Sequence, residues 1–481
     1  CPPSQSAKKE NNMASIPHSK GDRGFKKVMK RFDMTLFTVT AILVVDQLAA
    51  SASIGTQSIF WWIFTMIAFF IPYGLITAEL GTTYPEQGGI YGWVRNAFGA
   101  KWGARTSWLY WINVALWMPS VYILFAGIFA QLFYPEMTLW TQILLGIVLT
   151  WLTVWVNAIA LDIGKWVPNI GALFKAIIML SIGIGGFYYA SRNGVANEIS
   201  LKSVMPTWGA SLAFLPVIVY NFLGFELMSG AAEEMDNPAR DIPKSIVTAG
   251  VIIAAFYLLG TVGILIALPV DEIGLIDGLI DTLRQLFGDS QLGTAFVYGL
   301  GLMALYTFFA NMVTWTVGAN RSAAEAAVDG DLPAIFGKLH EVYKTPVSAA
   351  VLTGIVSTVV IILYGFFAGS AEDLFWTLFA FSSVVFLIPY ILMFGAFLKL
   401  RRIDKDQPRP YRVPGGHGTA VALTVICLLF IFQAIFFFIF VPGDLDWGYA
   451  GSIIGGVLVT ILVGEWLVAR AGATKAALTK N

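Results

Sequence analysis

The chain is organised as a series of long apolar runs separated by short polar segments. A bilayer core of about 30 Å needs roughly 20 apolar residues per helix, and runs of that kind recur from about residue 34 onward. They predict twelve membrane spans, at about 34–56, 58–80, 104–133, 138–160, 166–190, 209–230, 245–269, 293–319, 346–368, 374–399, 418–441 and 449–469. Only residues 55–58 separate the first two spans. The pattern therefore predicts an all-α, multi-pass membrane protein.

Composition excludes several classes of soluble protein. Of the 481 residues, 57% are hydrophobic and 12% are charged, and the mean hydropathy is +0.72, whereas a soluble domain carries about 25% charged residues. An ordinary cytosolic enzyme, a nucleic-acid binder and a disordered scaffold are thereby excluded. The 30 basic and 30 acidic residues cancel, so no overall charge attracts a polyanion. We expect no disulfide framework, metal site or other cofactor, because the cysteines and histidines are scattered: Cys1, Cys427, His18, His340 and His417.

Lysine and arginine residues concentrate on one side of the predicted membrane. With the N-terminus in the cytoplasm, the cytoplasmic segments contain 26 of the 30 basic residues, and the external loops contain only Arg192, Lys202 and Arg284. Because positively charged loops stay in the cytoplasm, we expect a protein of the inner (plasma) membrane with both termini cytoplasmic. Residues 1–12, a polar stretch before Met13, could be foreign to the natural chain and are left out of the fold reasoning.

Three ionisable side chains stand out within the predicted spans: Asp46 in span one, Lys175 in span five and Glu226 in span six. An unpaired charge in hydrocarbon costs several kcal/mol, so such residues indicate function by default. A structural ion pair, or a side chain that reaches the interface from a helix end, is the alternative for each of them. Glu226 is the candidate for proton coupling, because a mid-membrane carboxyl group loses hydration.

Spans one and six also contain signs of interrupted helices. In span six, Asn221 and Gly224 precede Glu226, and in span one the small residues 49–53 follow soon after Asp46. Broken helices at corresponding positions of two repeats mark a mid-membrane substrate site in secondary transporters. An unwound backbone leaves N–H and C=O groups free to bind a ligand. The pairing of these two spans, five apart, predicts a substrate site between them.

Several sequence motifs occur in order along the chain and resemble those of the amino acid–polyamine–organocation (APC) superfamily. The resemblance covers about residues 33–412 and is greatest to the glutamate:GABA antiporter branch. The motifs are Ala78-Glu79-Leu80, Tyr84-Pro85-Glu86-Gln87-Gly88-Gly89-Ile90-Tyr91-Gly92-Trp93-Val94, Phe222-Leu223-Gly224-Phe225-Glu226, Glu234-Met235-Asp236-Asn237-Pro238, Asn320-Arg321-Ser322, Asp329-Gly330-Asp331-Leu332-Pro333 and Arg409-Pro410-Tyr411-Arg412-Val413-Pro414-Gly415-Gly416.

The resemblance implies a LeuT-type fold, with two inverted five-helix repeats, discontinuous helices one and six, and two peripheral helices. It also implies transport of amino acids or amines by alternating access, with the substrate between spans one, three, six, eight and ten. The implied division of the chain is a cytoplasmic tail (1–31), a transport core (32–400, with repeats at about 32–190 and 209–400), a basic loop (401–417), spans eleven and twelve (418–470) and a second tail (471–481).

One departure from the family pattern bears on the substrate. Many members carry Gly-Ser-Gly in span one, where this chain has Val44-Val45-Asp46 followed by Gln47, as the glutamate:GABA branch also lacks the glycines. Valine resists unwinding and Asp46 adds a negative charge. This segment favours an amine or an ω-amino acid whose ammonium group pairs with Asp46.

The resemblance also suggests roles for other residues. Tyr220 and Trp315 would close over the ligand and attract an ammonium group through cation–π interaction, worth about 1–2 kcal/mol when desolvated. The amides of Asn221 and Asn311 could donate to a carboxylate, although plain packing or an interhelical hydrogen bond would also explain these residues. Lys175 resembles a lysine that takes the place of sodium in proton-coupled members. We therefore expect Lys175 to take part in proton coupling together with Glu226, and transport to be independent of sodium.

Two further functions stay open at this point. A non-transporting amino acid sensor, or a subunit that needs a partner chain, is the main alternative to an exchanger. A membrane enzyme is a third possibility, but the sequence has no HExxH, nucleophile elbow or phosphate loop. The expected partners are the lipid bilayer and a small amino acid or amine, with no nucleic acid, and the protein is expected to be a monomer or a homodimer.

Overall fold

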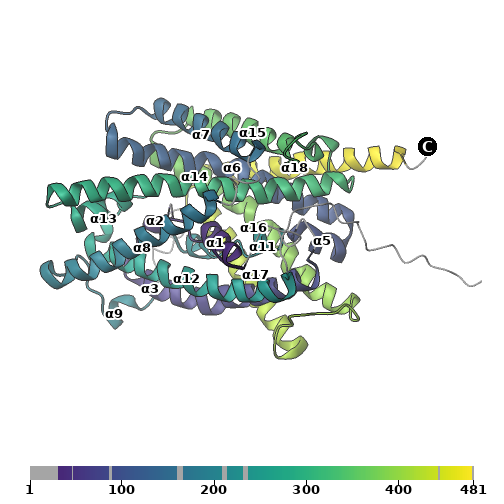
Figure 1. The fold of residues 1–481 in the computed structure, drawn as a ribbon, viewed down its shortest axis with the longest axis horizontal. Helices are drawn as coiled ribbons and strands as arrows, with labels where there is room; N and C mark the ends of the chain where they lie inside the picture. The colour runs from purple at the N-terminus through teal and green to yellow at the C-terminus, as the bar shows by residue number, and fades with distance from the viewer. Residues whose placement is uncertain are drawn as a thin grey trace, which may run out of the picture.

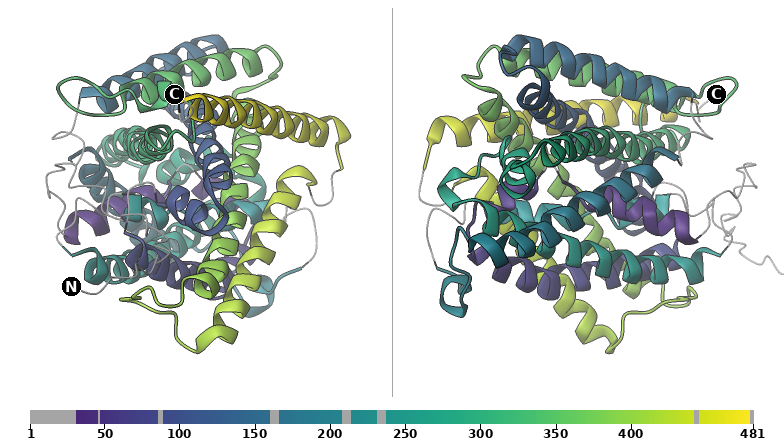
Figure 2. Two further views of the ribbon diagram at one scale, coloured as in Figure 1. Left: turned by 90° about the vertical axis from the view of Figure 1, so that its right-hand side faces the viewer. Right: turned by 60° about the vertical axis from the view of Figure 1, so that its left-hand side comes forward.

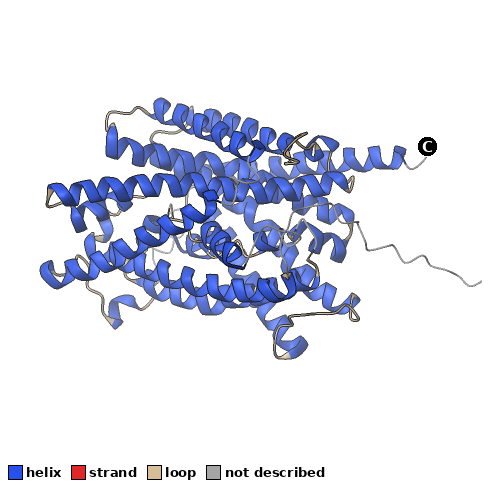
Figure 3. Ribbon diagram, in the orientation of Figure 1, coloured by secondary structure: helices blue, strands red, loops and turns tan. Residues whose placement is uncertain are grey.

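The computed structural model describes residues 31–45, 47–85, 89–159, 166–207, 214–230, 237–441 and 445–478. Within these ranges the chain is helical and contains no strand (Figure 3). The elements, labelled in part in Figure 1, are α1 (Arg31–Ile42), α2 (Leu48–Ala52), α3 (Gln57–Thr65), η1 (Met66–Phe70), α4 (Ile71–Thr83), α5 (Ile90–Phe98), α6 (Ala100–Phe133), α7 (Leu139–Ile159), α8 (Trp166–Asn193), α9 (Leu201–Val204), α10 (Leu215–Asn221), α11 (Glu226–Gly230), α12 (Pro238–Ala267), η5 (Val270–Glu272), α13 (Gly278–Phe287), α14 (Gln291–Val328), η6 (Ala334–Gly337), α15 (Val347–Gly365), α16 (Ala371–Ile403), α17 (Gly416–Ile439) and α18 (Trp447–Leu478).

Ten of the helical segments described are long and apolar enough to cross a membrane. They coincide with the predicted spans two to five and seven to twelve, and α3, η1 and α4 together form span two. The prediction of a multi-pass, all-α protein is confirmed by this pattern. Three short helices, α5, α9 and α13, lie between the predicted spans.

Predicted spans one and six are each divided into two short helices. In span one, α1 ends at Ile42 and α2 begins at Leu48, and in span six α10 ends at Asn221 and α11 begins at Glu226. Gly224 has φ +132°, a backbone conformation that residues with a Cβ atom strongly disfavour. Glycine at this position therefore permits the break in span six. The predicted interruptions are confirmed. Asp46 lies outside the described residues.

Local sequence signals define where several long helices begin. Asn237 caps α12 by accepting a hydrogen bond from the backbone N–H of Arg240 (3.3 Å), and Pro238 occupies the first turn, where its missing N–H costs nothing. Ser290 caps α14 and Ser370 caps α16 in the same way. These caps satisfy donors that would otherwise be unpaired at the helix ends.

The helices differ strongly in how much of their surface the bundle covers. Of the apolar window of α6, 89% is buried, whereas the figure is 28% for α17 and for α18. The helix α1 packs against α8, α12 and α14, and every residue of α2 and α10 is buried. The helix α18, yellow in Figure 2, extends to the edge of the bundle. A broad apolar surface on the outer helices is what a bilayer requires. The interrupted helices are therefore in the interior and α17 and α18 are peripheral.

Small residues allow α8 and α12 to pack closely beside α1. A Cβ atom added at Gly263 would lie 2.6 Å from the carbonyl oxygen of Ile182, and one at Gly186 would lie 3.0 Å from the Cα of Gly263. Such contacts are too short for any larger residue. Glycine at a helix interface permits this approach in a membrane, where packing rather than hydrophobic burial holds helices together.

Candidate functional site

The carboxylate of Glu226 is surrounded by tyrosine hydroxyl groups. Glu226 is the first residue of α11 and is 2% exposed. Its Oε1 accepts hydrogen bonds from Tyr110 on α6 (2.8 Å) and Tyr390 on α16 (2.6 Å), and its Oε2 accepts one from Tyr73 on α4. Three donors from three different spans thus converge on one buried acid at the interruption of span six.

The hydroxyl group of Tyr73 has a fixed direction. Its oxygen accepts hydrogen bonds from the backbone N–H groups of Gly224 (3.0 Å) and Phe225 (2.9 Å), so both of its lone pairs are used and its proton points to Glu226. Tyr73 therefore satisfies two backbone donors that the unwound segment leaves unpaired. Three hydroxyl donors match an ionised carboxylate, which can only accept. Protonation of Glu226 at Oε1 would require Tyr110 or Tyr390 to turn from donor to acceptor.

A second tyrosine joins the two interrupted spans. The hydroxyl group of Tyr257 on α12 accepts from the backbone N–H of Val44 (2.9 Å) and donates to the carbonyl of Ile42 (2.5 Å), with the carbonyl of Asn221 at 3.3 Å as a longer alternative. One side chain thereby contacts the unwound backbone of span one and the end of α10. The two breaks are adjacent in space, as the pairing of spans one and six predicts.

The other residues predicted in span one lie in the interior. Val44, Val45 and Gln47 are each no more than 3% exposed, and they occupy the unwound stretch between α1 and α2. The valine side chains therefore do not prevent unwinding. This agrees with the slightly lowered helix propensity of β-branched residues. Asp46, between them, is not among the described residues.

Lys175 lies between span five and the end of α1. Its ammonium group, 1% exposed, donates to the backbone carbonyl of Thr40 (2.5 Å) and lies 3.4 Å from the Oδ1 of Asn311 on α14. Thr40 belongs to the last turn of α1, where carbonyl groups lose their helical partners. The cation thus lies next to the break in span one.

Aromatic side chains cover the site on one side. The indole of Trp315 makes edge contacts with Trp117 and Phe386, and Tyr220 makes similar contacts with the same two residues. The indole N–H of Trp315 donates to the carbonyl of Ala41 (2.9 Å). A Cβ atom at Gly224 would lie 3.2 Å from the Trp315 ring, so this glycine also permits the ring to approach the break. Tyr220 and Trp315 thus share two aromatic neighbours, and their closing over a ligand stays a prediction.

Buried amide groups near the breaks are incompletely bonded. Asn221 donates to the hydroxyl oxygen of Ser51 on α2 (3.3 Å), which is an interhelical bond of the kind the alternative interpretation expects. Within the described part of the chain, Asn221 Oδ1, Asn311 Nδ2 and both polar side-chain atoms of Asn113 have no hydrogen-bond partner. Unsatisfied buried polar atoms are rare and require an explanation. Binding of a polar ligand by Asn221 and Asn311 stays a prediction.

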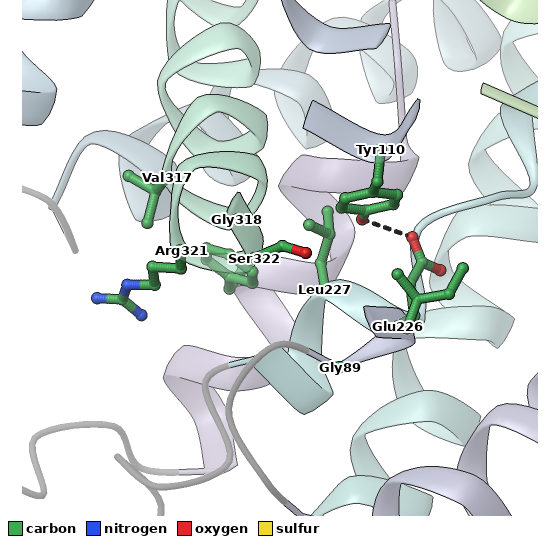
Figure 4. A pocket seen from close by; sticks show the side chains of 10 residues that line it. Gly89, Tyr110, Glu226, Leu227, Val317, Gly318, Arg321 and Ser322 are labelled. Atoms are coloured by element: carbon green, nitrogen blue, oxygen red, sulfur yellow. Dashed lines mark hydrogen bonds between the residues drawn. The ribbon is translucent and has the colours of Figure 1, made fainter. Parts of the chain in front are cut away.

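A small cavity of about 30 Å³, enough for about one water molecule, lies beside Glu226 (Figure 4). Tyr110 and Glu226 lie at one side of it, Leu227 lies between, and Arg321 and Val317 of α14 lie at the other. Phe37, Gly89, Ile90, Gly318 and Ser322 complete the lining. The cavity therefore lies between the buried acid, the start of α5 and the C-terminal part of α14.

Four residues at this site escape the sequence reasoning: Tyr73, Tyr110, Tyr390 and Asn113. Each lies well inside an apolar span and away from the interfaces where tyrosine is common. A hydroxyl or amide group in mid-membrane needs a partner, and that signal could have identified them. Asn113 lies three residues after Tyr110 and four before Trp117, so all three share a face of α6.

The chain is similar to known membrane transporters along most of its length. The amino acid permease family matches residues 29–462. The chain belongs to this family. A probable agmatine/putrescine antiporter, AguD, of Lactococcus lactis is 35% identical over 454 residues, which cover 92% of this chain and 95% of the relative. An uncharacterized transporter of Legionella pneumophila is 28% identical, over 92% and 97% of the two chains. A glutamate/gamma-aminobutyrate antiporter of Lactococcus lactis is 22% identical, over 87% and 84%.

Membership of this family identifies the general activity. The chain is a multi-pass membrane transporter of the APC superfamily that acts on amino acids or amines. The resemblance inferred from the sequence motifs is confirmed. The substrate, the coupling ion and the roles of individual residues stay predictions.

Proposed function

We propose that this permease exchanges cationic amines across the membrane and couples this exchange to protons through Glu226. The observation that carries the proposal is the buried Glu226 carboxylate, which lies at a helix break, next to aromatic side chains and beside a small cavity. A carboxylate and aromatic rings both attract a cation, and the cation–π contribution grows when water is excluded.

Two observations favour amines over acidic amino acids. The relative named an agmatine/putrescine antiporter is 35% identical, whereas the relative named a glutamate/gamma-aminobutyrate antiporter is 22% identical. The second observation is the acidic Asp46 in span one, at the place where many family members have Gly-Ser-Gly. A negative charge there would pair with an ammonium group and repel a carboxylate.

The proposed mechanism is alternating access in a LeuT-type fold of twelve spans. Among the described residues, the cavity beside Glu226 is lined by the start of α5 and the C-terminal part of α14, whereas Trp117, Tyr220, Trp315 and Phe386 form an aromatic cluster. Together with the distribution of lysine and arginine, this supports an inward-facing state with both termini in the cytoplasm.

The proposed proton coupling rests on the three hydrogen bonds that the Glu226 carboxylate accepts. Uptake of a proton at Oε1 obliges Tyr110 or Tyr390 to reverse its hydrogen bond, while Tyr73 cannot reverse. Protonation therefore alters the links between α11, α6 and α16 and leaves the link to α4. Lys175, which contacts the end of α1, supplies a cation beside the break, so sodium is not required.

Counterflow in proteoliposomes tests the proposal. Vesicles are preloaded with unlabelled putrescine, agmatine, glutamate or γ-aminobutyrate, and uptake of labelled putrescine is measured; we expect stimulation by the two amines only. The Glu226→Gln variant should lose pH dependence, while the exposed control Glu198→Gln should keep it. Stimulation by glutamate alone would refute the amine assignment but retain an exchanger. If no preloaded substrate stimulates uptake of labelled putrescine, a sensor or a partner-dependent subunit would be favoured.

A further inference from the structure

A basic recess lies in the segment that joins α16 to α17, far from Glu226 in the sequence. It opens to solvent and has a volume of about 550 Å³. The segment projects at the lower edge of the molecule in Figure 1, outside the packed helices. Six of the seven lining residues are basic: Arg401, Arg402, Lys405, Arg409, Arg412 and His417, beside Gln407.

Two of these arginines form the floor of the recess and are already neutralised. Glu79 at the end of α4 is fully buried, and its carboxylate accepts from Arg401 Nε (2.8 Å), Arg409 Nη1 (3.4 Å) and the backbone N–H of Val413 (2.7 Å). A buried carboxylate with this many donors is well satisfied. It fixes the backbone of the joining segment, and therefore the positions of the other basic residues.

The remaining basic residues have no counter-charge bound to them. Among the described residues, no hydrogen bond or ion pair engages the side chains of Arg402, Lys405, Arg412 or His417. Of the two acids in the segment, Asp404 accepts from the hydroxyl group of Tyr84 (2.7 Å). The other, Asp406, is exposed and has no such bond within the part of the chain described. The recess therefore has an excess of positive charge on a rigid frame.

The N-terminus of α17 adds backbone donors at the same place. Gly415 adopts a left-handed conformation with φ +85°, and no side chain caps the helix. The α17 helix extends over 24 residues, so its first N–H groups carry the positive end of a full helix dipole. Free N–H groups beside arginine side chains are the arrangement that binds phosphate.

An exposed apolar stripe on α17 indicates where such a phosphate would come from. Val425, Leu429, Phe432 and Phe436 are 48%, 63%, 53% and 55% exposed. Their spacing of four, three and four residues places them on one face of the helix. The stripe begins eight residues after His417, about 12 Å along the axis. Acyl chains lying along this stripe would place a lipid headgroup at the recess.

We propose that the recess binds the phosphate group of an anionic phospholipid, held by Arg402, Lys405, Arg412 and the first turn of α17. The shared chemistry is that of any phosphate, and the apolar stripe favours the lipid over a soluble ion. The inference does not depend on which amine the protein transports. Glu79, Arg401 and Arg409 position the site and do not contact the ligand.

The test is a binding measurement on the full chain in detergent. Native mass spectrometry counts bound dioleoyl phosphatidylglycerol, dioleoyl phosphatidic acid and, as the neutral comparison, dioleoyl phosphatidylcholine. The variant R402Q/K405Q/R412Q removes three charges from the recess. The control R240Q/K244Q/K338Q removes three exposed charges from segments that, by the order of the crossings, lie at the same end of the bundle. Inorganic phosphate is added as a competitor.

We expect both anionic lipids to bind in preference to phosphatidylcholine. At roughly fivefold per lost charge, the recess variant should bind about 100-fold more weakly, while the control variant should bind like the wild type. Equal loss in both variants would mean that only general charge matters and would overturn the proposal. Displacement of the lipid by millimolar inorganic phosphate would assign the recess to a soluble phosphate and overturn the lipid assignment. A normal melting temperature for the recess variant confirms that it folds.

Discussion

Replacing Tyr73 with phenylalanine removes one hydroxyl group that makes three buried hydrogen bonds. Its oxygen accepts from Gly224 and Phe225 at 3.0 and 2.9 Å, and its proton goes to Glu226. A buried donor left unsatisfied costs about 1–3 kcal/mol, and a hydrogen bond to a charged group contributes about 1.5–3 kcal/mol. The matched control is Tyr110→Phe, which removes only a bond to Glu226. The difference between the variants therefore isolates the two backbone N–H groups, and Tyr73→Phe should lose at least about 2 kcal/mol more.

The free energy of unfolding of both variants can be measured in mixed micelles by reversible titration with denaturing detergent. Because Glu226 keeps its carboxyl group in both, a change in stability is not confused with the loss of a titrating residue. The melting temperature should fall in the order wild type, Tyr110→Phe, Tyr73→Phe. Equal free energies of unfolding for the two variants would show that the Tyr73 hydroxyl does not hold the unwound segment of span six, and would refute the reasoning.

Four other predictions concern the site and the packing around it. Glu226→Gln should still bind substrate, but its exchange rate should no longer vary between about pH 5 and 8, because an amide cannot titrate; a wild-type pH profile would make Glu226 a scaffold residue. Asp46→Asn should weaken binding of an amine by roughly 1.5–3 kcal/mol, as measured by isothermal titration; unchanged affinity for every ligand would remove Asp46 from the substrate site. Replacement of sodium by choline should leave uptake nearly unchanged because Lys175 supplies a fixed cation, and a steep sodium dependence would contradict this. Gly263→Ala should lower the melting temperature because its Cβ would lie 2.6 Å from a backbone oxygen, whereas Gly299→Ala, which meets nothing within 4 Å, should not; equal melting temperatures would mean that α8 and α12 can separate without cost.

Much of the architecture could be predicted from the sequence because the bilayer imposes the same requirements on each membrane-spanning segment separately. Each helix must bury its own backbone hydrogen bonds and expose apolar side chains over the same thickness, so hydropathy alone located ten long helices. The breaks were predictable for a similar reason. Gly224 and the intramembrane Glu226 are unfavourable in an uninterrupted lipid-facing helix, whatever their neighbours are.

Only the tertiary structure decided which polar groups meet. The partners of Glu226 are 116, 153 and 164 residues away in the chain. Their mid-membrane positions indicate that Tyr73, Tyr110 and Tyr390 each need a partner, but no local pattern shows that the shared partner is Glu226. The rotation and depth of each helix depend on side-chain packing between helices, because lipid tails are as apolar as the helices themselves and give no preference for one face. Packing contacts such as the close approach of Gly186 to Gly263 exist only once the helices have come together.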